Sequence, residues 1–215
     1  MKERPILFNA EMVNAILSGR KTQTRRAVKN VDRANCIPYS WKSLKTGKWV
    51  HGSNHVLDER SLEKCPFGKI GDRLWVKETY YLSKFFDNLK PSECYGSEVY
   101  SVSSMYGKHP DNIEKSDIGK TRPSIHMPRW ACRLVLEITD VRVERLQDIS
   151  EEDAKAEGIQ RIGGDNSCSP WQNYAGDWPF SAPSASFKSL WNSIYNNWDA
   201  NPWVWVVEFK VVEGV

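Results

Sequence analysis

The chain has 215 residues, with 30 Lys and Arg against 27 Asp and Glu, and 10 Trp. This length suits one domain with insertions or two small domains, and so many aromatic residues argue against a disordered chain. A net charge of +3 argues against a protein that binds nucleic acid over its whole surface. We expect a cytoplasmic protein without membrane contact, because no apolar run is long enough to span a bilayer and the N-terminus lacks a signal-peptide core.

The first predicted element is a helix between Asn9 and Gly19. Asparagine is a favoured N-cap, and glycine commonly follows the last helical turn. The helix would carry one apolar stripe, made of Met12, Val13, Ile16 and Leu17. From Lys21 to Val28 the pattern changes to a period of two, which predicts a strand.

The densest cationic segment of the chain spans residues 18–29, SGRKTQTRRAVK, and holds five basic residues. It follows directly on the predicted helix. Two interpretations are open: a solvated loop, or a site for a phosphate or nucleobase.

Three further segments follow in the first half of the chain. Residues 41–50 predict a small hairpin that turns at Thr46 and Gly47. Residues 74–79 predict a strand after two glycine turns. Residues 83–124 are polar and irregular, and we interpret them as an insertion or lid.

The second half begins with the clearest strand pattern, over residues 131–146. A short helix follows, with Ser150 as its cap and Gly158 at its end. Residues 160–183 are a second long loop. A helix is then predicted from the spacing of Phe187, Leu190, Trp191, Ile194, Tyr195 and Trp198. The chain closes with an apolar strand over residues 202–212.

These elements predict an α+β fold in a single domain over residues 1–215. Strands lie at both ends and in the middle, and no regular βα alternation or repeat appears. The closing strand is too apolar for an open sheet edge, so we expect a mixed, partly closed β-barrel with peripheral helices. Long insertions are expected near 30–65, 83–124 and 160–183.

The cysteines are odd in number and form no C-x-x-C pair, which indicates reduced thiols. They are Cys36, Cys65, Cys94, Cys132 and Cys168. His51 and His55 lie four residues apart between Cys36 and Cys65, but the close cysteine pair of most zinc sites is missing. We therefore favour surface histidines over a metal site and expect no cofactor.

Three polar residues stand where local structure does not require them. Lys21 and Thr24 follow the first helix, and Glu157 lies at the end of the short helix, where the helix dipole disfavours a carboxylate. Each also has a structural interpretation: a solvated cation, a good strand former, and an ion-pair partner of Lys155 or a nearby Arg. Spacing alone does not decide between the two.

The segment SGRKTQTRR resembles the signature G-x-K-T-x-T-x-R of the ASCH domain family. The matched positions are Gly19, Lys21, Thr22, Thr24 and Arg26. Three more stretches resemble the family's later elements: GDRLWVKE, DISEEDAKAEG and WVWVVEFKVV. The long form of the chain resembles ASCH-like proteins encoded by bacteriophages and prophages, and its three insertions have no counterpart in the smallest members.

The resemblance implies a PUA-like fold and a link to nucleosides or RNA. Small bacterial members are amidohydrolases that remove the acetyl group from acetylated cytidine, and their catalytic residues correspond here to Lys21, Thr24 and Glu157. Other members are thought to bind or cleave RNA. A modified nucleoside or RNA is therefore the expected partner.

The implied chemistry suits these three residues. A lysine amine is useful in amide hydrolysis only when neutral, and burial beside other cations would lower its pKa. Glu157 would then act as the acid/base partner, and Thr24 would hydrogen-bond Lys21 or the tetrahedral intermediate. In a regular strand Lys21 and Thr24 point to opposite faces, so we predict a bend just after Gly19.

Other residues are expected to bind the substrate or to surround it. Arg26 would hold the base or its sugar, with Trp75 or Trp130 as a stacking surface. His126 is placed at the pocket rim or in a structural role. The other basic residues of this segment, Arg20, Arg25 and Lys29, are expected to tune charge or face solvent.

Three functions remain open at this point. The leading one is hydrolysis of an acylated cytidine-type amine. The alternatives are a non-catalytic RNA- or nucleotide-binding module and a ribonuclease that uses Lys21 and Glu157 as its acid/base pair.

Overall fold

The computed structural model describes residues 1–28, 39–42, 49–52, 65–94, 99–101, 117–163 and 169–214. Its centre is a mixed five-stranded sheet in the order β1-β5-β8-β9-β2. The strands are β1 (Glu3–Leu7), β5 (Arg73–Lys77), β8 (Leu134–Arg145), β9 (Trp203–Gly214) and β2 (Gln23–Ala27). Only β1 and β5 pair in parallel. The predicted α+β class is confirmed.

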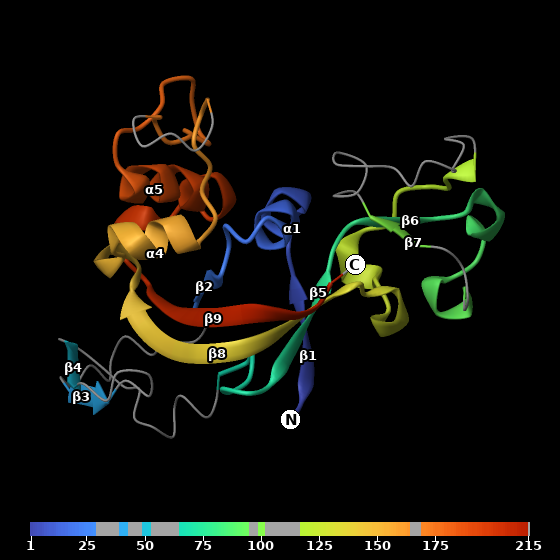
Figure 1. Cartoon of the computed structure of the whole chain (residues 1–215), viewed down its shortest axis with the longest axis horizontal. Helices are drawn as coiled ribbons and strands as arrows, with labels where there is room; N and C mark the ends of the chain where they lie inside the picture. The colour runs from blue at the N-terminus through green and yellow to red at the C-terminus, as the bar shows by residue number, and fades with distance from the viewer. Residues whose placement is uncertain are drawn as a thin grey trace.

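Strands β8 and β9 pair along most of their length and form the curved middle of the sheet (Figure 1). β9 lies between β8 and β2, as its apolar sequence required. On one face Trp205 and Val207 join the main core, while on the other Val204 and Val206 join a second core. An apolar strand buried on both faces belongs inside a sheet, because an exposed apolar edge would pair with other chains.

Helix α1 (Ala10–Leu17) connects the two edge strands and covers one face of the sheet (Figure 1). Its predicted cap is confirmed, because Asn9 accepts a hydrogen bond of 2.8 Å from the backbone N–H of Met12. Val13 and Ile16 are buried in the main core. Leu17, the last residue of the predicted stripe, is 44% exposed and therefore lies outside the core.

The hydrogen-bonded sheet is open, with β1 and β2 as its edges. These edges are nevertheless linked, because the guanidinium of Arg26 in β2 donates a hydrogen bond of 2.7 Å to the carbonyl oxygen of Leu7 at the end of β1. Sequence analysis missed β1. The strand is short and holds Pro5, and within it only Ile6 is buried.

Two helices lie where β8 ends and β9 begins (Figure 1), and they pack on the face of β9 opposite to the main core. They are α4 (Glu151–Ala156) and α5 (Pro183–Ile194). Both pack on the second core, which contains Ala154, Phe187 and Trp191. The predicted final helix is confirmed as far as Ile194, whereas Tyr195 is its C-cap and Trp198 lies in a separate 3-10 turn. Ile194 and Tyr195 are exposed.

The predicted insertions carry small elements of their own. Strands β3 (Tyr39–Lys42) and β4 (Trp49–Gly52) form the expected hairpin, whose turn lies outside the described residues. The remaining elements are β6 (Tyr80–Leu82), β7 (Val99–Ser101) and the 3-10 turns η1 (Lys84–Phe86), η2 (Pro91–Glu93), η4 (Ser124–His126), η5 (Arg129–Ala131), η6 (Leu146–Asp148) and η7 (Trp198–Ala200). In the described ranges, no helix combines the length and the apolar character that crossing a bilayer demands.

Candidate active site

The end of α4 places Glu157. Ser150 accepts a hydrogen bond of 3.0 Å from the N–H of Asp153, which confirms the predicted cap, and Glu157 is the C-cap residue. Gly158 follows with φ +84°, a conformation that side chains disfavour. A Cβ on Gly158 would lie 2.7 Å from the Cβ of Lys21, so glycine also permits the close approach of the two segments.

A turn after α1 brings Lys21 to this point. Gly19 has φ +74°, and the N–H of Lys21 donates to the carbonyl of Ala15 at 2.9 Å, so the predicted bend is present. The chain next pairs with α4, since the N–H of Thr22 donates to the carbonyl of Ala156 at 2.9 Å. β2 then begins at Gln23 and pairs with β9.

Lys21 and Glu157 form a buried ion pair. The ammonium Nζ of Lys21 lies 2.9 Å from Oε2 of Glu157 and 2.8 Å from its carbonyl oxygen. Only 2% of Lys21 and 5% of Glu157 is exposed. Burial lowers the pKa of Lys21, the attraction of Glu157 opposes this, and the charges of Arg26 and Arg25 add to the lowering. The net effect is a lysine that loses its proton more readily than an exposed one.

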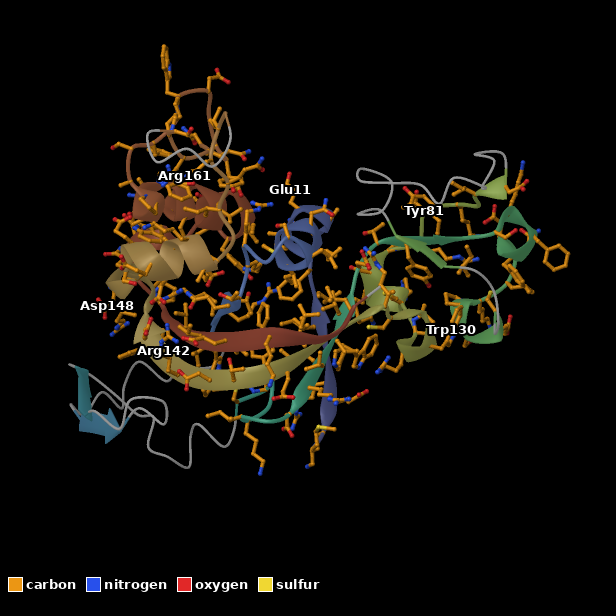
Figure 2. The ribbon with its side chains drawn as sticks, in the orientation of Figure 1. Glu11, Tyr81, Trp130, Arg142, Asp148 and Arg161 are labelled. Atoms are coloured by element: carbon orange, nitrogen blue, oxygen red, sulfur yellow. The ribbon has the colours of Figure 1, made fainter. Side chains whose placement is uncertain are left out.

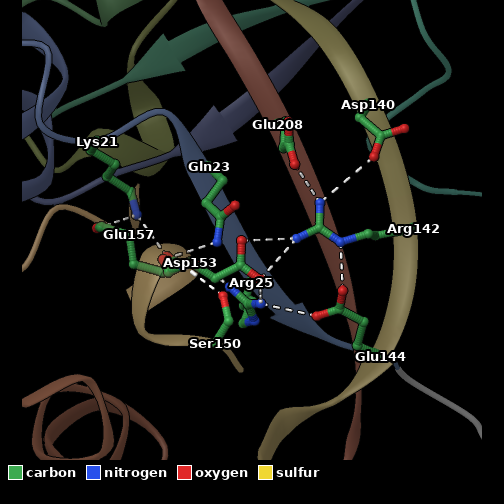
Figure 3. Close-up of polar contacts among 10 residues, drawn as sticks. All are labelled: Lys21, Gln23, Arg25, Asp140, Arg142, Glu144, Ser150, Asp153, Glu157 and Glu208. Carbon is green, nitrogen blue, oxygen red and sulfur yellow. Dashed lines mark hydrogen bonds and ion pairs between the residues drawn. The ribbon is translucent and has the colours of Figure 1, made fainter. Parts of the chain in front are cut away.

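The other carboxylate oxygen of Glu157, Oε1, accepts a hydrogen bond from Arg25. Nη1 of Arg25 donates to Oε1 at 3.2 Å, and its Nη2 lies 2.9 Å from Glu144 and 3.0 Å from Asp153 (Figure 3). Of the two roles expected for Arg25, facing solvent is wrong, because the residue is 2% exposed, whereas tuning charge agrees with its lowering of the Lys21 pKa. The strand register explains the difference, because Arg25 lies opposite Val206 on the face that α4 and α5 cover.

Arg142 of β8 extends the same network. It forms ion pairs with four carboxylates: Asp140, Glu144, Asp153 and Glu208 (Figure 3). Burial raises the pKa of Asp153, but the charges of Arg25 and Arg142 outweigh burial and lower it below its ordinary value. Asp153 is therefore held ionised between two guanidinium groups.

A cavity of about 300 Å³ borders the ion pair at Glu157. α1, the end of α4 and the loop after it form its walls. Its polar lining residues include Asn14, Arg20, Glu157, Gln160, Gln172 and Tyr174. The loop is held together at the cavity, where the N–H of Gln160 donates to the hydroxyl of Tyr174 at 3.1 Å. This volume and lining fit a small polar ligand.

Thr24 and Arg26 lie on the opposite face of β2 from Arg25. Thr24 is 2% exposed, and among the described residues the partners of Lys21 Nζ are the two oxygens of Glu157 rather than Thr24. Arg26 donates to the hydroxyl of Tyr195 at 3.2 Å. The ring of Phe8 lies 5.4 Å from the Arg26 guanidinium and 5.8 Å from Lys21 Nζ.

The remaining expected site residues lie elsewhere. Trp75 is in β5, with the ammonium of Lys77 at 5.4 Å from its ring. His126 is exposed, and its carbonyl accepts a hydrogen bond from the hydroxyl of Tyr80. Trp130 packs on the small core around Tyr80, far from the cavity residue Glu11 (Figure 2). Among the residues that the structure describes, none of these three lines the cavity at Glu157.

Sequence reasoning missed Phe8 and Tyr195 as neighbours of the site, and it missed the burial of Arg25. The signal for Arg25 was available: β2 alternates polar side chains, and a strand beside an apolar inner strand buries those of one face. The partners of Arg25 were not available, since they lie 119 to 132 positions away.

No cluster of three or more His, Cys, Asp and Glu suited to a metal occurs in the described parts of the chain. Cys65 and Cys94 are buried thiols, and burial raises the pKa of Cys65. The candidate ligands Cys36, His55 and Cys168 and the side chain of His51 lie outside the described residues.

Comparison with protein-family models, with curated proteins and with solved structures finds no match to this chain.

Proposed function

We propose that this protein is an amidohydrolase that removes an acyl group from the exocyclic amine of a cytidine-type nucleoside or nucleobase. The observation that carries the proposal is the buried Lys21–Glu157 pair, of which Glu157 lines a cavity of about 300 Å³ while Lys21 is not among the lining residues. Pockets that hold small ligands have volumes from about 300 Å³ upward. A buried lysine with a lowered pKa beside a carboxylate is a typical acid/base arrangement.

In the proposed reaction Lys21 acts as a base. An acyl-lysine would itself be an amide as stable as the substrate, so direct attack by the amine gains nothing. Neutral Lys21 instead takes a proton from water, and the hydroxide adds to the acyl carbon. Glu157 passes that proton to the exocyclic nitrogen, and the C–N bond breaks. The products are a carboxylic acid and the free cytosine amine, with one water consumed.

The proposal gives the other expected residues supporting roles. Thr24 would hydrogen-bond the tetrahedral intermediate, and Arg26 would hold the base or sugar; neither residue lines the cavity, so both roles need a substrate that reaches past it. Trp75, His126 and Trp130 would contact only a substrate that extends beyond the cavity. We also propose that the sheet and α1 form the partly closed PUA-like barrel, which the contact between Arg26 and the carbonyl of Leu7 supports.

The test is incubation with N-acetylated cytidine, followed by chromatography of the free nucleoside. Lys21→Met and Glu157→Gln should each lower kcat/KM by about 10²–10⁴-fold, the usual contribution of a positioned acid or base. Glu78→Gln removes an equally buried carboxylate from another region and should leave activity near that of the wild type. Absence of turnover, or turnover that both site substitutions leave intact, contradicts the proposal.

A nucleotide- or RNA-binding function is the second candidate. One observation favours it: among the described residues, Lys21 Nζ already makes two hydrogen bonds to Glu157, as in a purely structural ion pair. In that case calorimetry would detect acetylcytidine or single-stranded RNA binding without turnover, and RNA affinity would fall steeply with salt. Shortened RNA that depends on Lys21 would instead indicate a ribonuclease.

A further inference from the structure

We propose that Arg25 is a positioning residue of this site, which holds one carboxylate oxygen of Glu157 and leaves the other for Lys21. The inference rests on the proposed function, in which Lys21 must lose its proton. It concerns a residue that follows no catalytic pattern in the sequence and that does not line the cavity. Arg25 acts through Glu157.

The first argument is geometric. Glu157 shares its carboxylate between two cations, with Oε2 at 2.9 Å from Lys21 and Oε1 at 3.2 Å from Arg25. A charge-assisted hydrogen bond from the guanidinium to one carboxylate oxygen restricts the rotation of the carboxylate. The orientation of Oε2 toward Lys21 therefore depends on Arg25.

The second argument is that Arg25 itself is firmly held. Its side chain is fully buried, and its Nη2 lies within 3.0 Å of both Glu144 and Asp153. Arg142 contacts the same two carboxylates from the other side. A guanidinium fixed by two carboxylates, which are fixed in turn by a second guanidinium, keeps its position without help from a substrate.

The third argument is electrostatic. Arg25 competes with Lys21 for the charge of Glu157 and places a second positive charge near the ammonium, and both effects disfavour protonated Lys21. Charged groups reach this site from every element around it. They are Arg25 and Arg26 of β2, Asp153 of α4 and its C-cap Glu157, Glu144 and Arg142 of β8, Glu208 of β9, Glu11 in the first turn of α1 and Arg20 in the turn after it. Of these cations, Arg25 is the one that also bonds Glu157.

The decisive measurement is the titration of Lys21 without substrate. NMR of protein labelled at lysine Cε and Nζ, assigned with Lys21→Met, reports the protonation of Lys21 directly. Arg25→Gln should raise the Lys21 midpoint by about 1–2 pH units, the shift expected for one charge at this range in a partly buried site. In the activity assay the acidic limb of kcat/KM should move upward by the same amount.

Two matched variants separate positioning from simple structural support. Arg142→Gln removes an arginine that contacts Glu144 and Asp153 but does not contact Glu157, and it should shift the Lys21 midpoint much less. Arg25→Lys keeps the charge without the fork, so the midpoint should stay near that of the wild type while kcat falls. If Arg25→Gln does not fold, Arg25→Gln with Glu144→Gln restores the local charge balance and should still raise the midpoint.

The outcomes separate the two proposals. A midpoint that Arg25→Gln or the double variant leaves unchanged in a folded protein overturns the role of Arg25. Equal shifts in Arg25→Gln and Arg142→Gln also overturn it, because the effect would then be general electrostatics. A shifted midpoint in a protein without hydrolase activity upholds the role of Arg25 in tuning Lys21 and contradicts only the proposed function.

Discussion

Two buried carboxylates, Glu157 and Glu78, show how similar ion pairs differ in their possible functions. Glu78 is 2% exposed and lies 2.8 Å from Arg133, whose side chain is 23% exposed. Glu157 is bound by Lys21 and Arg25, whose side chains are at most 1% exposed. Arg133 can turn to water if its partner is lost, whereas Lys21 cannot. Burial of the cation therefore distinguishes an ion pair that can shift the pKa of a side chain from one that only holds two segments together.

The largest expected effect is on stability, when the ion pairs of Glu157 and Glu78 are broken in two separate variants. Glu157→Gln should lower the free energy of unfolding by about 3–5 kcal/mol, the usual cost of an uncompensated buried charge. Glu78→Gln should cost only about 1–3 kcal/mol, because Arg133 reaches solvent. Urea unfolding of both variants gives the comparison.

The pH dependence of that loss gives a second readout. Without Glu157 the folded pKa of Lys21 falls further, while in the unfolded chain lysine keeps its ordinary pKa of about 10.4. Between these two values the unfolded state binds more protons, so stability rises with pH. The loss of unfolding free energy caused by Glu157→Gln should therefore be smaller at pH 9 than at pH 6. A deficit that is the same at both pH values would show that Lys21 does not titrate there.

An intermediate loss of stability is expected at Gly158, which allows the chain at Glu157 to approach Lys21 closely. Gly158 and Gly163 both have φ +84°, so alanine is strained equally at each. At Gly158 the new Cβ would also lie 2.7 Å from Lys21 Cβ, while nothing lies within 4 Å at Gly163. Gly158→Ala should cost about 1–3 kcal/mol more than Gly163→Ala, as overpacking does. Equal midpoints in thermal unfolding would mean that the contact with Lys21 is loose.

The smallest effect on stability is expected at acidic pH and involves Asp153. The pKa of Asp153 is lowered in the folded state, mainly because Arg25 and Arg142 outweigh burial. Its contribution to stability is therefore present above the unfolded value of about 3.9 and is lost as pH falls through the folded pKa. Asp153→Asn should flatten the loss of stability below pH 4. An acid unfolding curve as steep as that of the wild type would contradict this assignment.

The parts of the fold that sequence analysis predicted depend on neighbouring residues. Asn9 and Ser150 cap their helices by hydrogen bonds to the residue three positions on, and Gly19 and Gly158 take positive φ where a helix ends. The alternation in β9 likewise marked a strand buried on both faces. β1 escaped detection because only Ile6 in it is buried.

The candidate site also has features that local sequence predicts and features that depend on tertiary contacts. The sequence by itself determined that a lysine follows a helix–glycine turn and that a glutamate ends a short capped helix. Only the tertiary structure decided that Lys21 and Glu157 meet, 136 positions apart, and that Arg25 joins them instead of facing water. The physical reason is register: a shift of β2 by one residue would turn Arg25 to the opposite face, and local sequence does not encode that choice. Pairing with β9 and burial beneath α4 fix it.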